Sequence, residues 1–357
     1  MRSVIALLRW LLLALNVLVV AGLAVSACSS HVPAQAWPLL SCAGMVFPVF
    51  LAAAVVFVPL WALWRGRRRW VCLSLAGLLL VARSVRTYCP LNVSQPVPEG
   101  AVKVLTYNVY NLKPAGEGKG GGLHPCLDYV LGSGADVVCL QEVDRRQWSA
   151  ADSLLGVVYP YRRCESWGAA SCALLSRYPV VSAERIDYAS EGNSSWAYRL
   201  AVGEDTLLVV NNHLESYRLG EEDRQEYKDV LLRPGETDVE QGVRGLIDKV
   251  AAANAVRGPQ ADSVAAYVED ARERYQIVCG DFNAPSISYP HYRLTRSLDD
   301  AFTRSGNGPG ISYHLSGMYF RIDNILCSPA MKPFGARVDR SIEASDHYPM
   351  YCYVALR

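Results

Sequence analysis

The stretch Ile277-Val-Cys-Gly-Asp-Phe-Asn-Ala-Pro285 decides the fold, because apolar residues of strand character run through a glycine into an acid and an amide. Alternate residues of a strand point to the same face, so Asp281 and Asn283 emerge together where this strand ends. Gly280 lets a backbone or a ligand come close beside them. An acid and an amide directed at one point suit a bound water, a metal ion or a phosphate oxygen. The alternative for this stretch alone is an Asx turn that only ends a strand.

The rest of residues 101–357 repeats this pattern of short strands separated by helical or loop segments. The other expected strands include Val102–Val109, Asp136–Glu142, Tyr198–Val202, Thr206–Asn212, Arg321–Cys327 and Met350–Val354. Apolar residues recur at helical spacing from Val243 to Val250, and a second helix is expected over Ala261–Arg274. Many short strands with helices between them indicate an α/β sandwich, in which two sheets are covered by helices.

Acids, amides and histidines concentrate where these strands end. The six strand ends carry Asn108, Glu142, His213, Asp281 with Asn283, Asp323, and Asp346 with His347. Taken singly, each has an ordinary structural role: His213 as a core histidine, for example, or Asp323 as an ion-pair partner of Arg321. Together, and without a cysteine or serine nucleophile motif, they suit hydrolysis of a phosphate ester by a metal-activated water. Carboxylate oxygens hold Mg²⁺, and a base and an acid handle the two protons.

The charges are unevenly distributed along the chain. Residues 1–100 hold eight arginines and a single acid, Glu99, which leaves 27 basic and 33 acidic residues and a formal charge of −6 for 101–357. Strong non-specific binding of nucleic acid depends on Lys and Arg side chains that neutralise phosphates. The acidic body therefore does not favour nucleic acid as a partner, although a local basic cleft stays open as an alternative.

Three apolar segments predict a membrane anchor. Val4–Val25 is long enough for a bilayer span of ~20 residues, and Leu39–Trp64 is nearly free of charge, with prolines that a membrane helix tolerates. Trp70–Tyr88 is the weakest of the three, because Arg83 and Arg86 must reach toward an interface. The alternative for the first segment is a cleaved signal peptide, but further apolar sequence follows it.

The arginines between these segments predict the orientation. The connection Ser29–Ala36 has no Arg or Lys, whereas the next one is Arg65-Gly-Arg-Arg-Arg69. The positive-inside rule places the N-terminus and this second connection in the cytoplasm of a bacterial cell. If Trp70–Tyr88 spans the membrane, the body is periplasmic or extracellular; if it lies along the surface, the body is cytoplasmic. We expect an anchor over 1–88 with spans at 4–25, 39–64 and 70–88, a proline-containing linker over 89–100, and a body over 101–357.

The motifs around the polar strand ends occur in the order and rough spacing of a known superfamily. They are Thr-Tyr-Asn108, Leu-Gln-Glu142, Asn-His213-Leu, Gly-Asp281-Phe-Asn283, Arg-Ile-Asp323 and Ser-Asp346-His347. The body resembles the endonuclease/exonuclease/phosphatase superfamily, which is DNase I-like and includes AP endonucleases, inositol polyphosphate 5-phosphatases and bacterial sphingomyelinases. This resemblance implies a catalytic domain built as a four-layer α/β sandwich, with two mixed sheets flanked by helices. With its apolar head, the chain is similar to membrane-anchored members from Bacteroidetes-type bacteria.

The resemblance also implies a metal site. Glu142 would be the principal Mg²⁺ ligand, with Asn108 and Asp346 near the metal and Mn²⁺ as a substitute ion. Some nucleases of the superfamily place an acid two residues after the first Asn, where this chain has Tyr110. A second metal ligand from this strand is therefore not expected, and a single Mg²⁺ is favoured over two.

Catalytic roles follow from the same resemblance. Asp281 would orient or deprotonate the attacking water, and Asn283 would hold the water or the phosphate. His347, aligned by Asp323, would serve as a base or as a stabiliser of the phosphate. His213 would bind the phosphate or the leaving oxygen. The resemblance does not fix which of these groups is the base.

Two further features leave alternatives open. The segment Ser176-Arg177-Tyr-Pro also matches the superfamily, so Arg177 is a candidate substrate contact, with a structural ion pair as the alternative. Cys164 and Cys172 flank a short loop, and they form a disulfide only if the body is exported to an oxidising compartment.

Three functions compete at this stage. The first is a membrane-anchored, Mg²⁺-dependent phosphodiesterase or phosphatase, for which the acidic body and the anchor favour a small or lipid-borne phosphate ester. The second is a Mg²⁺-dependent nuclease, which a basic, aromatic-lined groove would distinguish. The third is an inactive membrane-anchored interaction module, although such a module has no physical need for six polar strand ends.

Overall fold

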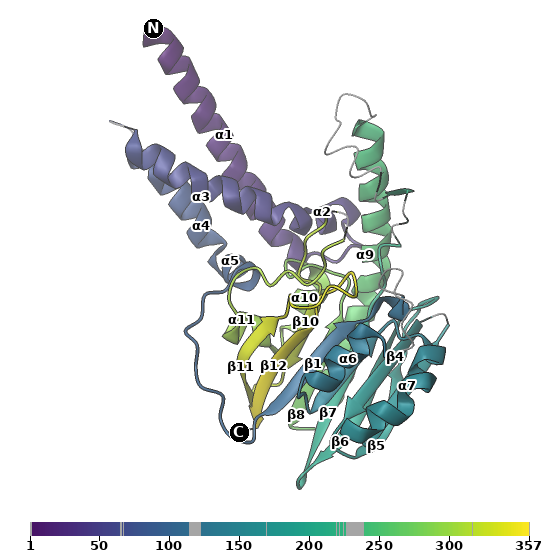
Figure 1. Cartoon of the computed structure of the whole chain (residues 1–357). Coiled ribbons are helices and arrows are strands. Elements are labelled where there is room, and N and C mark those ends of the chain that lie inside the picture. The colour runs from purple at the N-terminus through teal and green to yellow at the C-terminus, as the bar shows by residue number, and fades with distance from the viewer. Residues whose placement is uncertain are drawn as a thin grey trace.

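The two sheets of the body lie face to face beneath a bundle of apolar helices (Figure 1). The computed structural model describes residues 2–64, 66, 68–113, 123–168, 170–218, 220, 222, 223, 225, 239–315 and 317–356. The first sheet has the strand order β11-β12-β1-β2-β4-β3, and the second has the order β5-β6-β7-β8-β10-β9. Each sheet contains one parallel pair, β1 with β2 and β7 with β8, among antiparallel neighbours. Both sheets are therefore mixed, as the resemblance implied.

The strands of the first sheet are β1 (Val102–Asn108), β2 (Val137–Gln141), β3 (Tyr161–Trp167), β4 (Ala170–Ser176), β11 (Met331–Val338) and β12 (Met350–Leu356). The strands of the second sheet are β5 (Val180–Ile186), β6 (Ser194–Val202), β7 (Asp205–His213), β8 (Tyr275–Asp281), β9 (Asp299–Asp300) and β10 (Asp323–Cys327). β8 is buried along its whole length, which explains why it reads as an apolar run rather than as an alternating strand.

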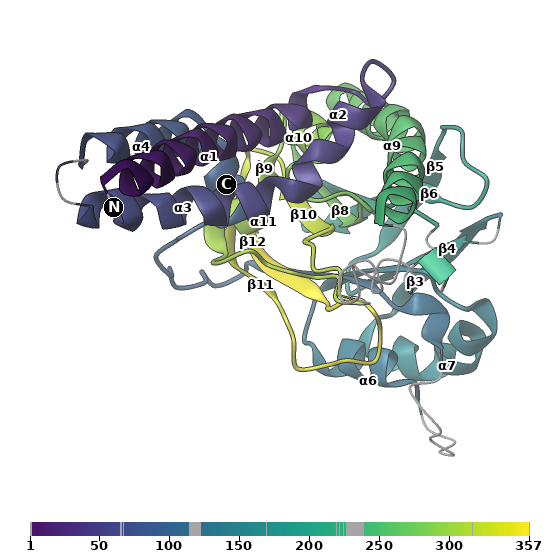
Figure 2. The same ribbon diagram turned by 90° about the horizontal axis from the view of Figure 1, so that it is seen from above.

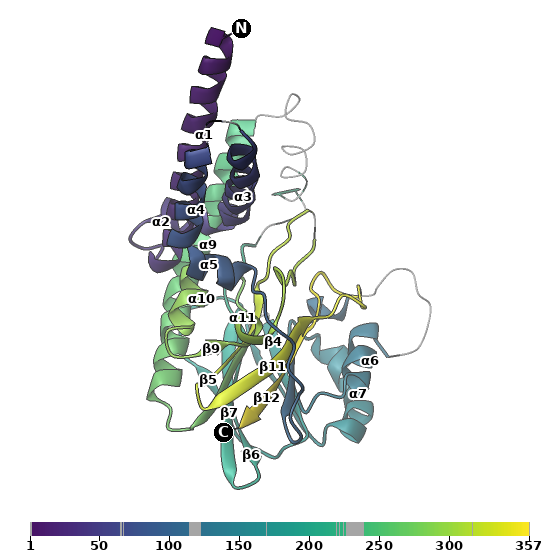
Figure 3. The ribbon, with the colours of Figure 1, turned by 90° about the vertical axis from the view of Figure 1, so that its left-hand side faces the viewer.

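Helices cover the outer face of each sheet, and the apolar core lies in three layers. Side chains such as Val104 and Ile277 fill the space between the sheets. α6 (Pro125–Gly132) and α7 (Arg145–Val158) pack on the first sheet. α9 (Val239–Asp270) and α10 (Tyr289–Leu294) pack on the second, and α11 (Ala301–Ser305) follows β9. Figure 3 shows α6 and α7 on one side of the sheets and α9 and α10 on the other. The predicted four-layer α/β sandwich is confirmed.

The register of the parallel strands carries polar residues to one edge of the sandwich. Asn108 at the end of β1 lies beside Gln141 of β2, and His213 at the end of β7 lies beside Asp281 of β8. β10 runs antiparallel to β8, so its first residue, Asp323, also pairs with Asp281. The two sheets meet here through a hydrogen bond of 3.0 Å from Asn108 Nδ2 to Asp281 Oδ2.

Gly280 is required at this edge by close contact between β8 and β7. Its φ angle is +124°, and a Cβ atom at this position would lie 2.1 Å from the carbonyl oxygen of Asn212. A side chain of any size would force the two parallel strands apart. The sequence expectation that a backbone approaches closely beside Asp281 is therefore correct, and the approaching backbone is that of the neighbouring strand.

The apolar head is a bundle of helices that stands on the body. Its helices are α1 (Arg2–Cys28), η1 (Ser29–His31), α2 (Pro38–Cys42), η2 (Ala43–Val46), α3 (Phe47–Leu63), η3 (Arg68–Trp70), α4 (Val71–Leu80) and α5 (Ala82–Tyr88). Two continuous helical segments, Val4–His31 and Pro38–Leu63, are long and apolar enough to cross a membrane. The third, Arg68–Tyr88, reaches that length only if its two halves are taken together, and they are bent by 66°. Figure 2 shows α1, α3 and α4 side by side.

Polar and small residues hold this bundle together. Ser74 of α4 donates a 3.0 Å hydrogen bond to the side-chain oxygen of Asn16, which is fully buried in α1. Such a bond between helices is favourable in an apolar surrounding, where no water competes for it. Asn16, the polar interruption of the first apolar segment, therefore lies at a helix contact and not on the exposed face.

The head and the body are packed against each other. Ile287, from the loop after β8, is buried in the apolar cluster of the head. Gln35 Nε2 donates a 2.8 Å hydrogen bond to the carbonyl oxygen of Ala255 in α9. The expected linker also contacts the body, since Asn92 bonds to Asn307 and to the backbone of Gly306.

Two local expectations from the sequence are wrong: a pair of separate helices over the α9 region, and a further strand at Ile311–Leu315. The two helices expected around Val243–Val250 and Ala261–Arg274 form one helix, α9, which continues through Pro259. Ile311–Leu315, which carries strand-like residues, is not a strand but contributes one isolated bridge residue, Tyr313. Cys164 and Cys172 are free thiols, and Cys172 is buried with its Sγ 3.7 Å from the carbonyl oxygen of Ser194. The sequence also predicts a charged, helical region from Leu214 to about Tyr275. Residues 226–238 of this region lie outside the described residues.

A methyl group at Gly44 is expected to loosen the contact between head and body. The added Cβ would lie 1.9 Å from the carbonyl oxygen of Ile287, which is backbone and has no rotamer to yield. Overpacking of this kind costs about 1–3 kcal/mol. We expect Gly44→Ala to lower the melting temperature of the detergent-solubilised chain and to speed protease cleavage within 90–100. Gly245→Ala is the matched control, because nothing lies within 4 Å of its added Cβ. Equal melting temperatures for both variants would contradict the expectation.

Candidate active site

Asp281, Asp323 and His347 form a buried cluster at the end of β8. His347 Nδ1 lies 2.7 Å from Asp323 Oδ2, and His347 Nε2 lies 3.7 Å from Asp281 Oδ2. Asp323 comes from the first position of β10 and His347 from the loop before β12, so three separate segments meet here. All three side chains are nearly inaccessible to solvent. The sequence motifs containing them are therefore brought into direct contact, although they span residues 281–347.

The charges within this cluster are strongly coupled. Burial raises the pKa of Asp281 to about 6, and the nearby Asp323 carboxylate adds to the increase, whereas His347 and His213 oppose it. Burial acts to lower the pKa of His347, but the carboxylates of Asp323 and Asp281 outweigh it and hold that pKa well above its ordinary value. The favoured state is an imidazolium held between two acids. Such a group donates a proton or a hydrogen bond toward a negatively charged substrate.

Glu142 lies near this cluster, linked to Asp281 by the side chain of Asn108, and it has a strained backbone conformation. Its φ angle is +53°, a left-handed value that is uncommon for residues other than glycine. Asn108 Nδ2 donates a 3.0 Å hydrogen bond to Glu142 Oε1, and Asn111 Nδ2 donates one of 3.2 Å to Glu142 Oε2. The side chain of Glu142 remains 24% exposed. The turn after β2 thus aims a carboxylate into the cleft while its outer edge stays open.

His213 has unsatisfied ring nitrogens at the centre of the site. Both Nδ1 and Nε2 are buried and have no hydrogen-bond partner among the described residues. Nε2 lies 3.5 Å from Glu142 Oε1 and 3.9 Å from Asp281 Oδ2, beyond hydrogen-bond distance of either. Because buried polar atoms are rarely left unpaired, these nitrogens are suited to bind a polar group that enters the site.

Asn283 and Asp346 complete the set, and both line the cleft. Asn283 has a φ angle of +48°; its backbone N–H donates to Asp281 Oδ1 at 2.7 Å and its Nδ2 donates to the carbonyl oxygen of Leu214 at 2.9 Å. The strand end is therefore also an Asx turn, so the two interpretations of the opening stretch describe one structure. Asp346 is half-buried beside Ser345, whose hydroxyl donates to the carbonyl oxygen of Asn108 at 2.8 Å.

The donor set fits a divalent cation. Asp281, Asp323 and His347 each offer a ligand atom, and the three atoms lie within 4.8 Å of one another. However, Asp323 and His347 already satisfy each other through their hydrogen bond of 2.7 Å. The partly exposed carboxylate of Glu142, with amide oxygens and a further acid nearby, offers the hard oxygen ligands that Mg²⁺ prefers.

Arg177 is not brought to this cluster. It follows β4 and forms a 3.1 Å ion pair with Asp136, at the start of β2, whereas Glu142 follows the opposite end of that strand. The ion pair was the alternative that the sequence left open. Arg177 is therefore not part of the site that we propose.

Two residues that contact the site or the strands beneath it, Asn211 and Tyr313, were not predicted from the sequence. Asn211 bridges the two sheets, since its Oδ1 accepts from Gln141 Nε2 at 2.6 Å and its Nδ2 donates to the carbonyl oxygens of Leu140 and Ala173. Tyr313 packs edge-on against the ring of His347, with 5.1 Å between the ring centroids. The signal for Asn211 was present, because an amide in the middle of a buried apolar strand needs hydrogen-bond partners. No comparable sequence signal marks Tyr313.

The raised pKa of Asp281 predicts how the stability of the metal-free protein depends on pH. The folded carboxyl binds its proton more tightly than the unfolded one, whose pKa is 3.8. This contribution to stability is fully present below pH 3.8 and is lost as the pH rises through about 6. Relative to Asp281→Asn, the free energy of unfolding of the wild type is expected to fall by about 2 kcal/mol between pH 4 and pH 7, since one pKa unit corresponds to about 1.4 kcal/mol. Denaturant titrations in EDTA measure it, and a difference that does not change with pH would contradict it.

The comparisons with known proteins agree with this geometry. Residues 105–347 match the model of the Endonuclease/Exonuclease/phosphatase family, and residues 9–88 match a domain of unknown function. No curated protein sequence matches the chain.

Solved structures with this fold cover the body. The structure of D. rerio TDP2 complexed with single-strand DNA product is 15% identical, with a TM-score of 0.53, and the match covers 72% of this chain and 100% of that one. The human Nocturnin catalytic domain with bound sulfate is 18% identical, with a TM-score of 0.52 and coverage of 73% and 97%. An endonuclease/exonuclease/phosphatase from Beutenbergia cavernae is 15% identical, with a TM-score of 0.51 and 72% coverage of each chain. At these identities the likeness shows a shared fold.

The family match covers more than half of the chain and includes every strand end that contributes to the cluster. Members of this family are metal-dependent hydrolases of phosphate esters, either phosphoesterases or nucleases. The body carries that fold, and its cleft holds the acids and histidines that such hydrolysis requires. The chain therefore belongs to the endonuclease/exonuclease/phosphatase family.

Proposed function

We propose that the chain is a Mg²⁺-dependent phosphoesterase anchored in a bacterial cell membrane and that its substrate is a lipid-borne phosphate ester. Glu142 would hold the ion, with Asn108 and Asp346 beside it, and Mn²⁺ would substitute. The bound cation supplies charge that offsets the phosphate oxygens and makes a bound water more acidic. The carboxylate open to the cleft and its amide neighbours support this assignment.

Asp281 and His347 would handle the proton transfer and the developing charge. Asp281 accepts a proton from the attacking water, because its carboxyl is buried and has a pKa near the working range. His347, aligned by Asp323, presents its imidazolium Nε2 to the phosphate and stabilises the charge that develops there. The unsatisfied nitrogens of His213 would bind a phosphate or leaving-group oxygen, and Asn283 would orient the water.

The observation that carries the substrate class is the apolar wall of the cleft. Beside its acids, the cavity of about 190 Å³ is lined by Leu246 and Val250 of α9, by Met318 and Phe320, and by Met45 of the head. Met45 belongs to η2, near the start of the second candidate span, Pro38–Leu63, so the cleft opens next to the part of the chain expected in the bilayer. A small polar phosphate ester has little apolar surface to bury against this wall, whereas the apolar part of a lipid is stabilised by contact with it.

The position of the body on the bundle supports a periplasmic or extracellular catalytic domain. The body contacts the Ser29–His31 end of α1, while the N-terminus projects from the far end (Figure 1). If α1 crosses the membrane, the N-terminus and the body lie on opposite sides of it. With the N-terminus in the cytoplasm, α4 and the bent α5 would return the chain to the outer surface. A phosphatase fused after Arg357 should be active; a fluorescent but phosphatase-silent fusion would overturn this orientation.

The full-length protein in mixed micelles provides the test of function. We expect Mg²⁺-dependent hydrolysis of sphingomyelin or a phospholipid that EDTA abolishes, at rates well above those for inositol phosphates, plasmid DNA or RNA. Faster cleavage of DNA or RNA would establish the nuclease alternative. Loss of activity on every substrate, with folded protein and added metal, would favour the inactive module.

A charge in the apolar wall should separate lipid from soluble substrates. Leu246 is half-buried in the cleft wall, and Leu246→Glu is expected to raise KM for the long-chain lipid about tenfold or more, because burial of a leucine side chain is worth about 1.5–3 kcal/mol. KM for a short, water-soluble ester should change little. Val243→Glu, at an exposed position of the same helix, is the matched control. Equal effects of Leu246→Glu on both substrates would contradict a lipid-binding role for the wall.

A further inference from the structure

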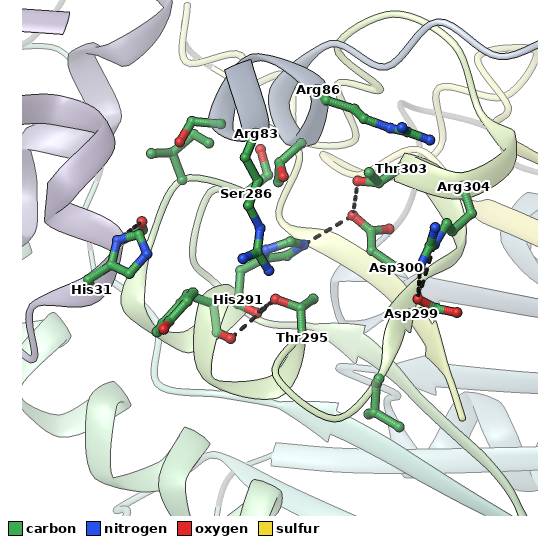
Figure 4. Close-up of a pocket in the computed structure, with 16 residues that line it drawn as sticks. His31, Arg83, Arg86, Ser286, His291, Thr295, Asp299, Asp300, Thr303 and Arg304 are labelled. Carbon is green, nitrogen blue, oxygen red and sulfur yellow. Dashed lines mark hydrogen bonds and ion pairs between the residues drawn. The ribbon is translucent and has the colours of Figure 1, made fainter. Parts of the chain in front are cut away.

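A second cavity lies between the head and the body, apart from the cleft. It has a volume of about 270 Å³ and shares no lining residue with the candidate active site. Figure 4 shows Arg83 and Arg86 of α5 at the top of the cavity, His31 on one side, Thr303 on the other, and His291 and Thr295 below Arg83. Its wall is unusually polar for a junction between an apolar bundle and a folded domain. The space equals that of roughly nine water molecules.

The charges around this cavity do not balance. Asp300 is compensated by the buried Arg321 at 3.0 Å, and Asp299 is compensated by Arg304. The guanidinium groups of Arg83 and Arg86 have no carboxylate partner among the described residues, and both side chains are exposed. Two positive charges therefore remain for a ligand, and Ser84, which also lines the cavity, adds a hydroxyl group.

The position of the cavity determines what reaches it. It lies where α1 ends at η1 and where α4 bends by 66° into α5, so its head residues lie at the ends of two of the candidate spans, at the same end of the bundle. An apolar bundle that crosses a bilayer places this end at the level of the lipid headgroups. Arginines at such an end reach toward anionic phosphates of the surface.

We propose that this cavity binds the phosphate headgroup of an anionic membrane lipid through Arg83 and Arg86. Guanidinium groups match phosphate oxygens in pairs of parallel hydrogen bonds. A bound headgroup neutralises the two arginines and fixes α5 against the body at the membrane surface. The proposal requires that the head lies in a bilayer, but it does not depend on the catalytic roles given above.

Native mass spectrometry of the full-length protein tests this site. Released from micelles with phosphatidylglycerol and phosphatidylcholine, the wild type should retain one phosphatidylglycerol with at least a tenfold preference. Arg83→Gln/Arg86→Gln should lose this preference, since each hydrogen bond to a charged group contributes about a factor of ten. Arg83→Lys/Arg86→Lys should keep part of it, and Arg146→Gln/Arg272→Gln, which removes two exposed charges elsewhere, should keep all of it.

Two results would overturn the proposal. One is equal retention of phosphatidylglycerol by the wild type and the folded Arg83→Gln/Arg86→Gln variant. The other is complete displacement of the lipid by millimolar inorganic phosphate, which would make free phosphate the ligand. Because retention is read without catalysis, failure of this site and failure of the proposed activity are distinguishable.

Discussion

Replacement of Asp281 with asparagine is expected to lower kcat by about a thousandfold while the protein stays folded. The substitution keeps the shape of the side chain but removes the group that would accept the proton of the attacking water, and general base catalysis contributes about 10²–10⁴-fold. The buried carboxyl has a raised pKa, so its ionised form is costly to the folded protein near pH 7. The variant should therefore melt at the same temperature as the wild type or higher. A site that lowers stability in return for chemistry has this signature.

The measurement combines single-turnover hydrolysis with a thermal melt of the same preparation. Asp270→Asn makes the same chemical change at an exposed position and should leave both quantities unchanged. If Asp281→Asn retained the wild-type kcat, the assignment of the proton-accepting side of the cleft would be wrong. A large drop in melting temperature would instead identify Asp281 as a structural acid.

Replacement of Arg321 with methionine is expected to destabilise the full-length protein by about 3–5 kcal/mol. The side chain is 1% exposed, and it forms a 3.0 Å ion pair with Asp300 and donates a 2.8 Å hydrogen bond to the carbonyl oxygen of Thr87 at the end of the head. Burial alone would raise the pKa of Asp300, but Arg321 and His291 hold it far below its usual value. Without Arg321 a charged, buried carboxylate is left uncompensated.

Denaturant titration in detergent measures this loss. Arg321→Met/Asp300→Asn should recover most of the lost stability, because a buried pair removed as a whole leaves no unpaired charge. Arg304→Met removes an exposed arginine that pairs with Asp299 and should cost less than about 1 kcal/mol. A loss of similar size for Arg304→Met and Arg321→Met would show that burial does not set the effect.

The sequence predicts the site better than it predicts its surroundings. Asp281, His213 and Asp323 were predicted because each lies at one end of a strand. The register of β7, β8 and β10 then places His213 and Asp323 on either side of Asp281. The long separation to His347 required the resemblance to a family, since no local pattern places the loop before β12 beside β8. Arg177 is marked equally well by its motif, but β4 runs antiparallel to β2. Its C-terminal end therefore places Arg177 beside Asp136, at the edge of the sheet opposite Glu142. Strand direction, which short motifs do not encode, separates the two cases.

The contact between head and body could not be predicted from either part alone. Ile287 follows a strand of the body in the sequence but is buried in the core of the head. Gly44 lies in the head, and its backbone packs against the carbonyl group of Ile287. Arg321 reads as a partner for Asp323, yet its ion pair is with Asp300. Each of these interactions depends on how two separately patterned units meet. The spacing of apolar residues shows which face of a helix or strand is buried. It does not show which other element packs on that face.

The pairing of β1 with β12 has a consequence for the timing of synthesis. β12 lies next to β1 in the sheet, and Asp346 and His347 are made just before it, nearly 240 residues after Asn108. While a ribosome is still producing the segment between β10 and β12, Asp281 and Asp323 are already made, but the imidazole of His347 is not. The Asp323 carboxylate therefore lacks its 2.7 Å partner until residue 347 is made. The buried cluster is complete only when Met350–Leu356 pairs with β1 and His347 lies beside Asp281.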